Sequence, residues 1–193
     1  MATAAVTTRP GQVLADLLPA SRTKDVALVV GGAVLTGIAA QIVVPVPGSP
    51  VPVTGQTFAA LLVGTALGAR RGLLSLALYA LVGLAGVPWF QGGTSGLTAS
   101  FGYILGMLLA ATVAGELARR GGDRSALRMA GTMAIGSAVI YAVGVPWLMA
   151  HAGMSFPAAL AAGVTPFLIG DALKAALAMG VLPSTWKLLG RRG

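Results

Sequence analysis

The chain has 193 residues, of which 56% are hydrophobic and only 9% are charged, and its mean hydropathy is +0.86. Soluble domains carry roughly 25% charged residues, so the composition excludes an ordinary soluble protein and indicates an integral membrane protein. The formal net charge of +8 does not indicate a nucleic-acid-binding face, because the basic residues are spread over separate short loops.

Residues 1–25 precede the first long apolar run and are predicted to form a cytoplasmic tail, because they lack the apolar core of a cleaved signal peptide. Within this tail, Val13, Leu14, Leu17 and Leu18 share one helical face. This spacing predicts a short interfacial helix ahead of the membrane domain.

Six apolar segments follow, and they predict an all-α membrane bundle rather than a barrel of alternating strands. The second and third segments meet at Arg70-Arg71-Gly72, and each covers only about 24 Å. That is less than a hydrocarbon core of about 30 Å, so we expect short spans buried against their neighbours. The predicted spans are residues 26–44, 54–69, 72–87, 101–117, 129–150 and 165–189, which makes 26–189 one six-helix domain and 190–193 a cytoplasmic tail.

The basic residues predict the orientation of this bundle. Twelve of the thirteen Lys and Arg residues fall in the N-terminal tail, in the loop between the second and third segments, in the loop between the fourth and fifth, and at the C-terminus from Lys187 onward. The other three loops contain no charged residue. Because cytoplasmic loops carry an excess of Lys and Arg, we expect six crossings with both termini in the cytoplasm.

Small residues recur at four-residue spacing, which lets helix backbones approach closely within lipid. We expect most of them to serve internal packing, although Ala33 and Gly37 in the first segment are candidates for an outward groove that receives another membrane protein. The other rows are Gly64 and Gly68; Gly102, Gly106 and Ala110; and Ala130, Ala134, Ala138 and Ala142.

Asp171 and Lys174 are two opposite charges inside the otherwise apolar last segment. Residues three apart share one face of a helix, and each charge costs about 2.5–3.5 kcal/mol at the centre of a membrane helix. The pair is therefore expected to face the interior, either as a structural ion pair or as a ligand site. In a ligand site, Lys174 would take an anionic group and Asp171 would accept N–H donors.

Other polar and aromatic candidates gather on the same side of the membrane. The WFQGG run is the most suggestive, because its glycines permit a tight loop and Gln91 offers both a donor and an acceptor. Trp and Tyr at a membrane boundary are more often belt residues than ligand contacts. The candidates are Gln56, Trp89, Phe90, Gln91, Thr94, Ser95, Tyr103, Tyr141 and Trp147.

Missing residues and motifs limit the chemistry. The chain has no cysteine, and His151 alone makes a poor metal site, so we expect neither a metal ion nor a cofactor. No phosphate-binding P-loop and no hydrolase or metalloprotease motif occurs. The chain is therefore not expected to be an enzyme, and active transport would need energy from a partner or an ion.

Three stretches, in order along the chain, are similar to a known family: PVTGQTFAALLVGTALGARRGLLSLALYALVGLAGVPWFQGG, FGYILGM and PFLIGDALKAALA. They resemble BioY, the biotin-specific substrate-binding (S) component of energy-coupling factor (ECF) transporters. The resemblance covers about residues 26–189. One departure is Ala99-Ser100-Phe101-Gly102-Tyr103, where the family usually has Pro-Thr-Gly-Gly-Tyr.

The resemblance implies a six-helix S-component bundle in the plasma membrane of a prokaryote, which binds biotin from outside. It also implies a transmembrane coupling protein and two ATPases that drive inward release. Ligand contacts carry over to Asp171, Lys174 and the loop around Phe90 and Gln91, and coupling-protein contacts to Ala33 and Gly37. The alternative is an ion-coupled secondary carrier of a small carboxylate-bearing solute, with Asp171 as the coupling carboxylate.

Overall fold

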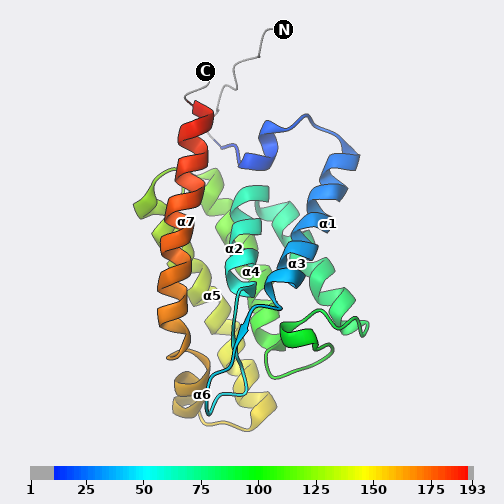
Figure 1. Ribbon diagram of the computed structural model, residues 1–193, viewed down its shortest axis with the longest axis vertical. Helices are drawn as coiled ribbons and strands as arrows, with labels where there is room; N and C mark the ends of the chain where they lie inside the picture. The colour runs from blue at the N-terminus through cyan, green and yellow to red at the C-terminus, as the bar shows by residue number, and fades with distance from the viewer. Residues whose placement is uncertain (1–10, 191–193) are drawn as a thin grey trace.

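The computed structural model describes residues 11–190 (Figure 1), so Arg9, Arg191 and Arg192 lie outside the described residues. Two short strands, β1 (Val43–Val44) and β2 (Val53–Thr54), pair antiparallel in the first long loop. The helices are η1 (Leu14–Leu17), α1 (Arg22–Ala39), α2 (Gln56–Leu67), α3 (Ala69–Leu84), η2 (Gln91–Gly93), α4 (Phe101–Arg119), α5 (Ala126–Ala152), α6 (Phe156–Gly163) and α7 (Phe167–Gly190), of which η1 and η2 are single 3₁₀ turns.

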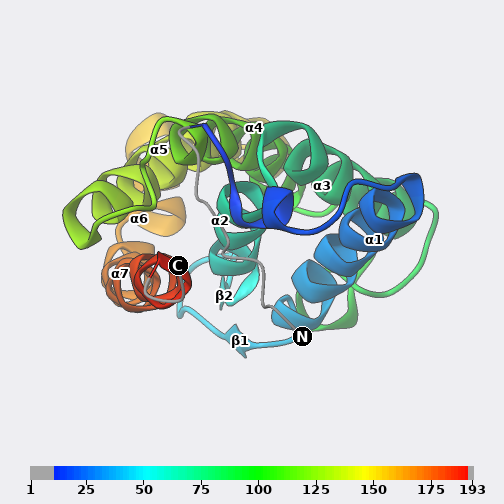
Figure 2. The ribbon, with the colours of Figure 1, turned by 90° about the horizontal axis from the view of Figure 1, so that it is seen from above.

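Helix α2 lies at the centre of the bundle (Figure 2). Helices α1, α3, α4 and α5 form an arc around it, with α4 in contact with α5, α2 and α3. Helix α7 packs mainly against α5, and the β1–β2 hairpin passes between α7 and α1. This placement buries α2 on most sides, as expected for a segment too short to stand alone in lipid.

The ends of the bundle differ in composition (Figure 1). One end, called here the arginine-rich end, contains η1, the start of α1, the α2–α3 junction, the α4–α5 loop and the end of α7. The opposite loop end contains the β1–β2 hairpin, η2 and α6, and these segments contain no Lys, Arg, Asp or Glu. The separation of basic and uncharged loops therefore exists in space as well as along the chain.

The expectation of a helical membrane bundle is confirmed, with shifts at the boundaries. Helix α1 begins at Arg22 rather than Val26, because Ser21 accepts the Lys24 N–H at 3.1 Å and caps the helix there. Helix α6 lies in a stretch that we expected to be a loop, and β1 takes up the last two residues of the first predicted span, so α1 ends at Ala39 rather than at Val44. The interfacial helix expected at residues 13–18 is only the single turn η1. Within residues 11–190, three helices are long and apolar enough to cross a membrane by length and composition: α4, α5 and α7.

Glycines bring the central helices into backbone contact. A methyl group on Gly64 would overlap the carbonyl oxygen of Ala111, so α2 and α4 can approach this closely only through a glycine. Gly106 meets the backbone of Ile140 in the same way between α4 and α5. The expected role of these glycines in internal packing is confirmed. The alanine row on α5 differs, because Ala134, Ala138 and Ala142 are exposed.

The outward groove expected at Ala33 and Gly37 is wrong for this structure. Ala33 is only 1% exposed, and a methyl group on Gly37 would lie 3.1 Å from the ring of Trp89. Both small residues therefore face the interior, where they let α1 pack closely against α3 and the loop that follows it. The exposed face of α1 carries larger side chains, such as Val30 and Ile38.

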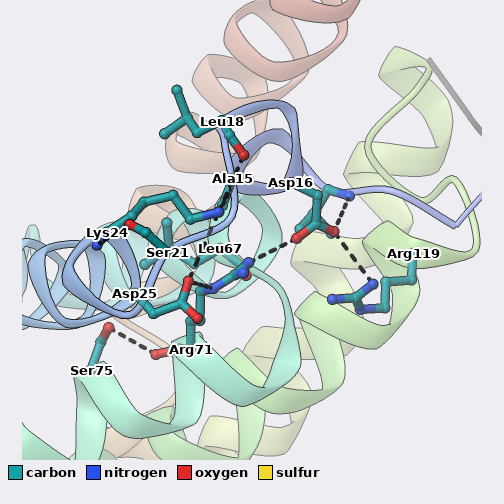
Figure 3. A network of polar contacts seen from close by, with 11 residues as sticks. Ala15, Asp16, Leu18, Ser21, Lys24, Asp25, Leu67, Arg71, Ser75 and Arg119 are labelled. Atoms are coloured by element: carbon teal, nitrogen blue, oxygen red, sulfur yellow. Dashed lines mark hydrogen bonds and ion pairs between the residues drawn. The ribbon is translucent and has the colours of Figure 1, made fainter. Parts of the chain in front are cut away.

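A network of charges joins four elements at the arginine-rich end (Figure 3). Arg71 of α3 donates to Asp16 in η1 at 2.8 Å and to Asp25 in α1 at 2.9 Å. Arg119 of α4 reaches the other Asp16 oxygen at 3.4 Å. Burial alone would raise the pKa of Asp16, but the hydrogen bonds from Arg71 and the Val13 N–H and the charges of Arg119 and Arg71 together lower it.

We expect Asp16→Asn to lower the free energy of unfolding by about 1–2 kcal/mol at neutral pH. This value lies between the contribution of an exposed ion pair and that of a hydrogen bond to a charged group. Because the folded pKa of Asp16 is lowered, its stabilisation is complete above the unfolded value near 3.9. It is lost as the pH falls through the folded pKa. Thermal unfolding of wild type and Asp16→Asn in detergent, across a range of pH, measures this difference in stability. Glu116→Gln, which removes an exposed ion pair with Arg120, is the control, and an equal loss there would contradict the expectation.

A second contact fixes α7 at this end. The Trp186 Nε1–H donates to Asp123 at 2.6 Å, and the Arg124 guanidinium lies 3.5 Å from the centre of the Trp186 ring. Burial raises the pKa of Asp123, while the Trp186 hydrogen bond and the Arg124 charge oppose that rise. These contacts tie α7 to the α4–α5 loop and so set the position of the charged pair further along the same helix.

Candidate functional site

A cavity opens near the loop end, between the first turns of α2 and α4 and the facing sides of α5 and α7. Its free volume is about 30 Å³. This volume is well below the range of about 300–1,000 Å³ for small-molecule sites, so the walls stand close together and would have to separate around a larger ligand. The lining residues are Val51, Pro52, Thr54, Gln56, Thr57, Gln91, Ser100, Tyr103, Met107, Ser137, Ile140, Tyr141, Phe167, Asp171 and Lys174.

Asp171 and Lys174 form one wall of the cavity. Their charged groups are 3.5 Å apart, and their side chains are only 17% and 13% exposed. Lys174 also donates to the Thr57 hydroxyl at 2.7 Å, and the Tyr141 hydroxyl donates to Asp171. The pair therefore faces the bundle interior, as the cost of charge in lipid requires, and it borders open space in addition to its own partners.

Gln56 and Tyr103 also lie where the sequence predicts polar groups near a ligand. Gln56 is 3% exposed and donates to the Tyr79 hydroxyl at 2.8 Å. The Tyr103 hydroxyl donates to the Gly163 carbonyl at 2.9 Å, which joins α4 to α6. Both side chains line the cavity. Because each already makes a hydrogen bond within the protein, both also stabilise the shape of the cavity.

Two polar atoms in the cavity wall lack a partner among residues 11–190. Gln91 donates through Nε2 to Thr98 at 3.5 Å, but its Oε1 accepts no hydrogen bond. Ser100 is 6% exposed and its Oγ also has no partner. A buried polar atom without a partner costs about 1–3 kcal/mol. Both residues line the same cavity, which makes the two atoms candidates for hydrogen bonds to a ligand.

Phe90 does not line the cavity, which corrects its expected role. Its side chain is fully buried, with ring centres 5.2 Å from Tyr79 and 6.2 Å from Phe101. It packs against Gly83 so closely that a methyl group there would overlap the ring. Phe90 therefore holds the η2 loop against α3 and α4, and it leaves its neighbour Gln91 facing the cavity.

The remaining candidates from the sequence also fall into two groups, those that line the cavity and those that do not. Tyr141 lines the cavity, whereas Trp89, Thr94, Ser95 and Trp147 do not. Trp89 donates to the Tyr79 carbonyl at 3.0 Å, and Trp147 donates to the Thr98 carbonyl at 3.0 Å. Both tryptophans thus fasten loops to helices.

Sequence reasoning missed Thr57, Ser100 and Ser137 as lining residues. Thr57 directly follows Gln56, but its contact with Lys174 depends on how α2 packs against α7, which the sequence does not specify. Ser100 is the N-cap residue of α4, but its side chain makes no capping hydrogen bond. Ser137 lies on the same face of α5 as Tyr141, one helical turn earlier in the chain.

The arrangement suits binding of a small polar molecule. It presents a cation, a carboxylate, and free amide and hydroxyl oxygens within one largely apolar cavity. Among residues 11–190, no three His, Asp or Glu side chains gather closely enough to hold a metal ion. The site can therefore hold a ligand that carries an anionic group together with N–H donors.

Comparison with known proteins gives the family. The model of the BioY family matches residues 9–191, which is most of the chain. This chain belongs to the BioY family.

Two BioY relatives illustrate the likeness. The chain is 37% identical to a probable biotin transporter BioY of Pyrococcus horikoshii, over 82% of this chain and 93% of that protein. It is 35% identical to biotin transporter BioY2 of Lactococcus lactis subsp. cremoris, over 78% of this chain and 83% of that protein. The match extends over most of each relative, so the family assignment covers the whole bundle.

A solved structure shares the BioY fold seen here. It is described as the S-component for biotin from an ECF-type ABC transporter, and it matches with a TM-score of 0.77 at 20% identity. The match covers 88% of this chain and 95% of that chain. The S-component fold expected from the sequence is therefore confirmed.

Proposed function

We propose that this chain is the biotin-binding S component of an ECF-type transporter, which captures biotin from outside and releases it inward. The observation that carries this proposal is the Asp171–Lys174 pair in the wall of a cavity near the uncharged loop end. The BioY relatives, which are named as biotin transporters, support it. Transport is not an enzymatic activity, and the chain has no P-loop of its own.

The proposed topology has six crossings by α1, α2, α3, α4, α5 and α7, with both termini in the cytoplasm. The arginine-rich end would face the cytoplasm, because Lys and Arg are enriched in cytoplasmic loops. The loop end, with the ligand cavity near it, would then face outward in a prokaryotic plasma membrane. An inward step from this site needs a transmembrane coupling protein and two ATPases, which are the proposed partners.

Biotin matches the polar groups of the cavity. Its valerate carboxylate suits the Lys174 ammonium, and its ureido ring offers two N–H donors that suit the Asp171 carboxylate. Gln91 Oε1 and Ser100 Oγ provide two further groups without partners in the described structure. The apolar part of the ligand would lie against Met107, Ile140 and Phe167.

Equilibrium binding of labelled biotin to the purified protein tests the proposal. We expect a dissociation constant below the micromolar range, and no affinity in that range would refute it. The ion-coupled alternative is tested separately by uptake into cells with an uncoupler while ATP is held constant. Uptake that continues with the uncoupler agrees with ATP-driven transport, whereas uptake that stops favours the alternative.

Ser100→Ala is expected to separate binding from stability. Because the Ser100 hydroxyl has no partner among residues 11–190, its removal should leave the melting temperature unchanged or slightly higher. If biotin pairs with this hydroxyl, its affinity should fall by about fivefold, the effect of roughly 1 kcal/mol. Ser75→Ala is the control, because that buried hydroxyl donates to Arg71 O within α3, away from the cavity. An equal loss of biotin affinity in both variants would contradict the expectation.

A further inference from the structure

A second recess lies on the outside of the bundle between α1 and α3, and it shares no residue with the ligand cavity. Its volume is about 630 Å³, and it begins at the arginine-rich end. Nothing in the proposed biotin site uses it. Apart from Val29, Leu67, Ala77 and Leu78, the lining consists of the residues discussed below.

The walls of this groove are apolar and exposed. Val26 and Val30 of α1 are 63% and 44% exposed, and Leu74 and Leu81 of α3 are 46% and 64% exposed. From Arg70 to Leu81, the α3 wall runs about 16 Å at about 1.5 Å per residue. This length matches half of a hydrocarbon core of about 30 Å, so the groove is as long as the acyl region of one leaflet.

The mouth of the groove carries an excess of positive charge. Arg70, Arg71 and Arg119 line it together with only one carboxylate, Asp25. Asp16, which is not among the lining residues, pairs with Arg71 and Arg119 (Figure 3), and the cations still outnumber the carboxylates. Arg70 is exposed, and its side chain makes no hydrogen bond or ion pair with any of residues 11–190.

We infer that this groove binds one anionic phospholipid, with its phosphate at Arg70 and Arg119 and one acyl chain along Val30, Leu74 and Leu81. Guanidinium groups bind phosphate oxygens through paired N–H donors, and basic pockets between membrane helices bind anionic head groups. The assignment to the cytoplasmic leaflet rests on the proposed orientation. The preference for an anionic head group rests only on the groove.

Native mass spectrometry of the full chain, released from vesicles with equal amounts of phosphatidylglycerol and phosphatidylcholine, tests this inference. We expect wild type to retain phosphatidylglycerol in preference to phosphatidylcholine. Arg70→Gln should lower the retained phosphatidylglycerol by about fivefold, the effect of one basic residue near a membrane surface. Leu74→Trp should also lower it, because the larger ring fills the groove without altering any charge.

Arg128→Gln is the matched control, because Arg128 is an exposed cation in the first turn of α5, outside the groove. It should leave lipid retention unchanged. Equal retention of the two lipids by wild type would overturn the inference, as would an equal effect of Arg70→Gln and Arg128→Gln. If the groove instead bound another protein, wild type would retain the two lipids equally. Thermal unfolding of each variant checks the fold independently of biotin binding.

Discussion

Lys174→Ala is expected to weaken biotin binding at least tenfold, or about 1.4 kcal/mol. The substitution removes the cation from the cavity wall and leaves the Asp171 carboxylate, 17% exposed, without its charged partner. It also removes the donor to the Thr57 hydroxyl. Titration of labelled biotin into the purified variant measures the change.

Lys187→Ala is the control for this experiment. Lys187 is an exposed lysine on the same helix, in its last turn at the arginine-rich end. Its removal should leave biotin affinity unchanged. If Lys174→Ala bound biotin as tightly as wild type while keeping its fold, the lysine would be a structural partner of Asp171 and the proposed ligand role would be wrong.

A comparison of biotin with its methyl ester assigns the ligand's orientation. The ester lacks the carboxylate charge, so wild type should bind it more weakly if Lys174 meets the valerate group. Lys174→Ala should then bind the acid and the ester almost equally, because the interacting cation is gone. A preference for the acid that persists in Lys174→Ala would place the carboxylate elsewhere.

Gly64→Ala is expected to have the largest effect on stability. The added methyl group would overlap the backbone carbonyl of Ala111, which no side-chain rotation can relieve. Overpacking of this kind costs about 1–3 kcal/mol, and about 2–4 °C of melting temperature per kcal/mol for a chain of this size. We therefore expect a decrease of about 2–12 °C. Biotin affinity should also fall, because α2 carries Gln56 and Thr57 into the cavity.

Gly131→Ala is the matched substitution. A methyl group at Gly131 on α5 would meet no atom within 4 Å. Because alanine is the better helix former by about 1 kcal/mol, the melting temperature should stay constant or rise. Similar destabilisation by both substitutions would mean that helix propensity or lipid contact, rather than the α2–α4 approach, governs the response.

The charged pair was predictable from sequence because the penalty for charge in lipid leaves few options. Asp171 and Lys174 had to face inward, and their spacing placed them on one face of a helix. Gln56, Gln91 and Tyr103 were predictable as polar groups near the same end. Their convergence on one cavity depends on how four helices pack, which no single segment specifies.

Other features were not readable from local patterns. Ser100 is the N-cap residue of α4, and only the structure shows that it lines the cavity and makes no capping bond. Ala33 and Gly37 have the small side chains that suit either an outward groove or internal packing, and the position of Trp89 decides for packing. Phe90 likewise became a core residue because Gly83 leaves room for its ring.

The most direct measurement is the identity of the small molecule that the protein carries through purification. Protein from biotin-supplied cells is denatured, and the released ligand is identified and quantified by mass spectrometry, for wild type and for Lys174→Ala. The account predicts biotin from wild type in near-equimolar amount and strong depletion in the variant. A different molecule from wild type, or as much biotin from the folded variant, would contradict it.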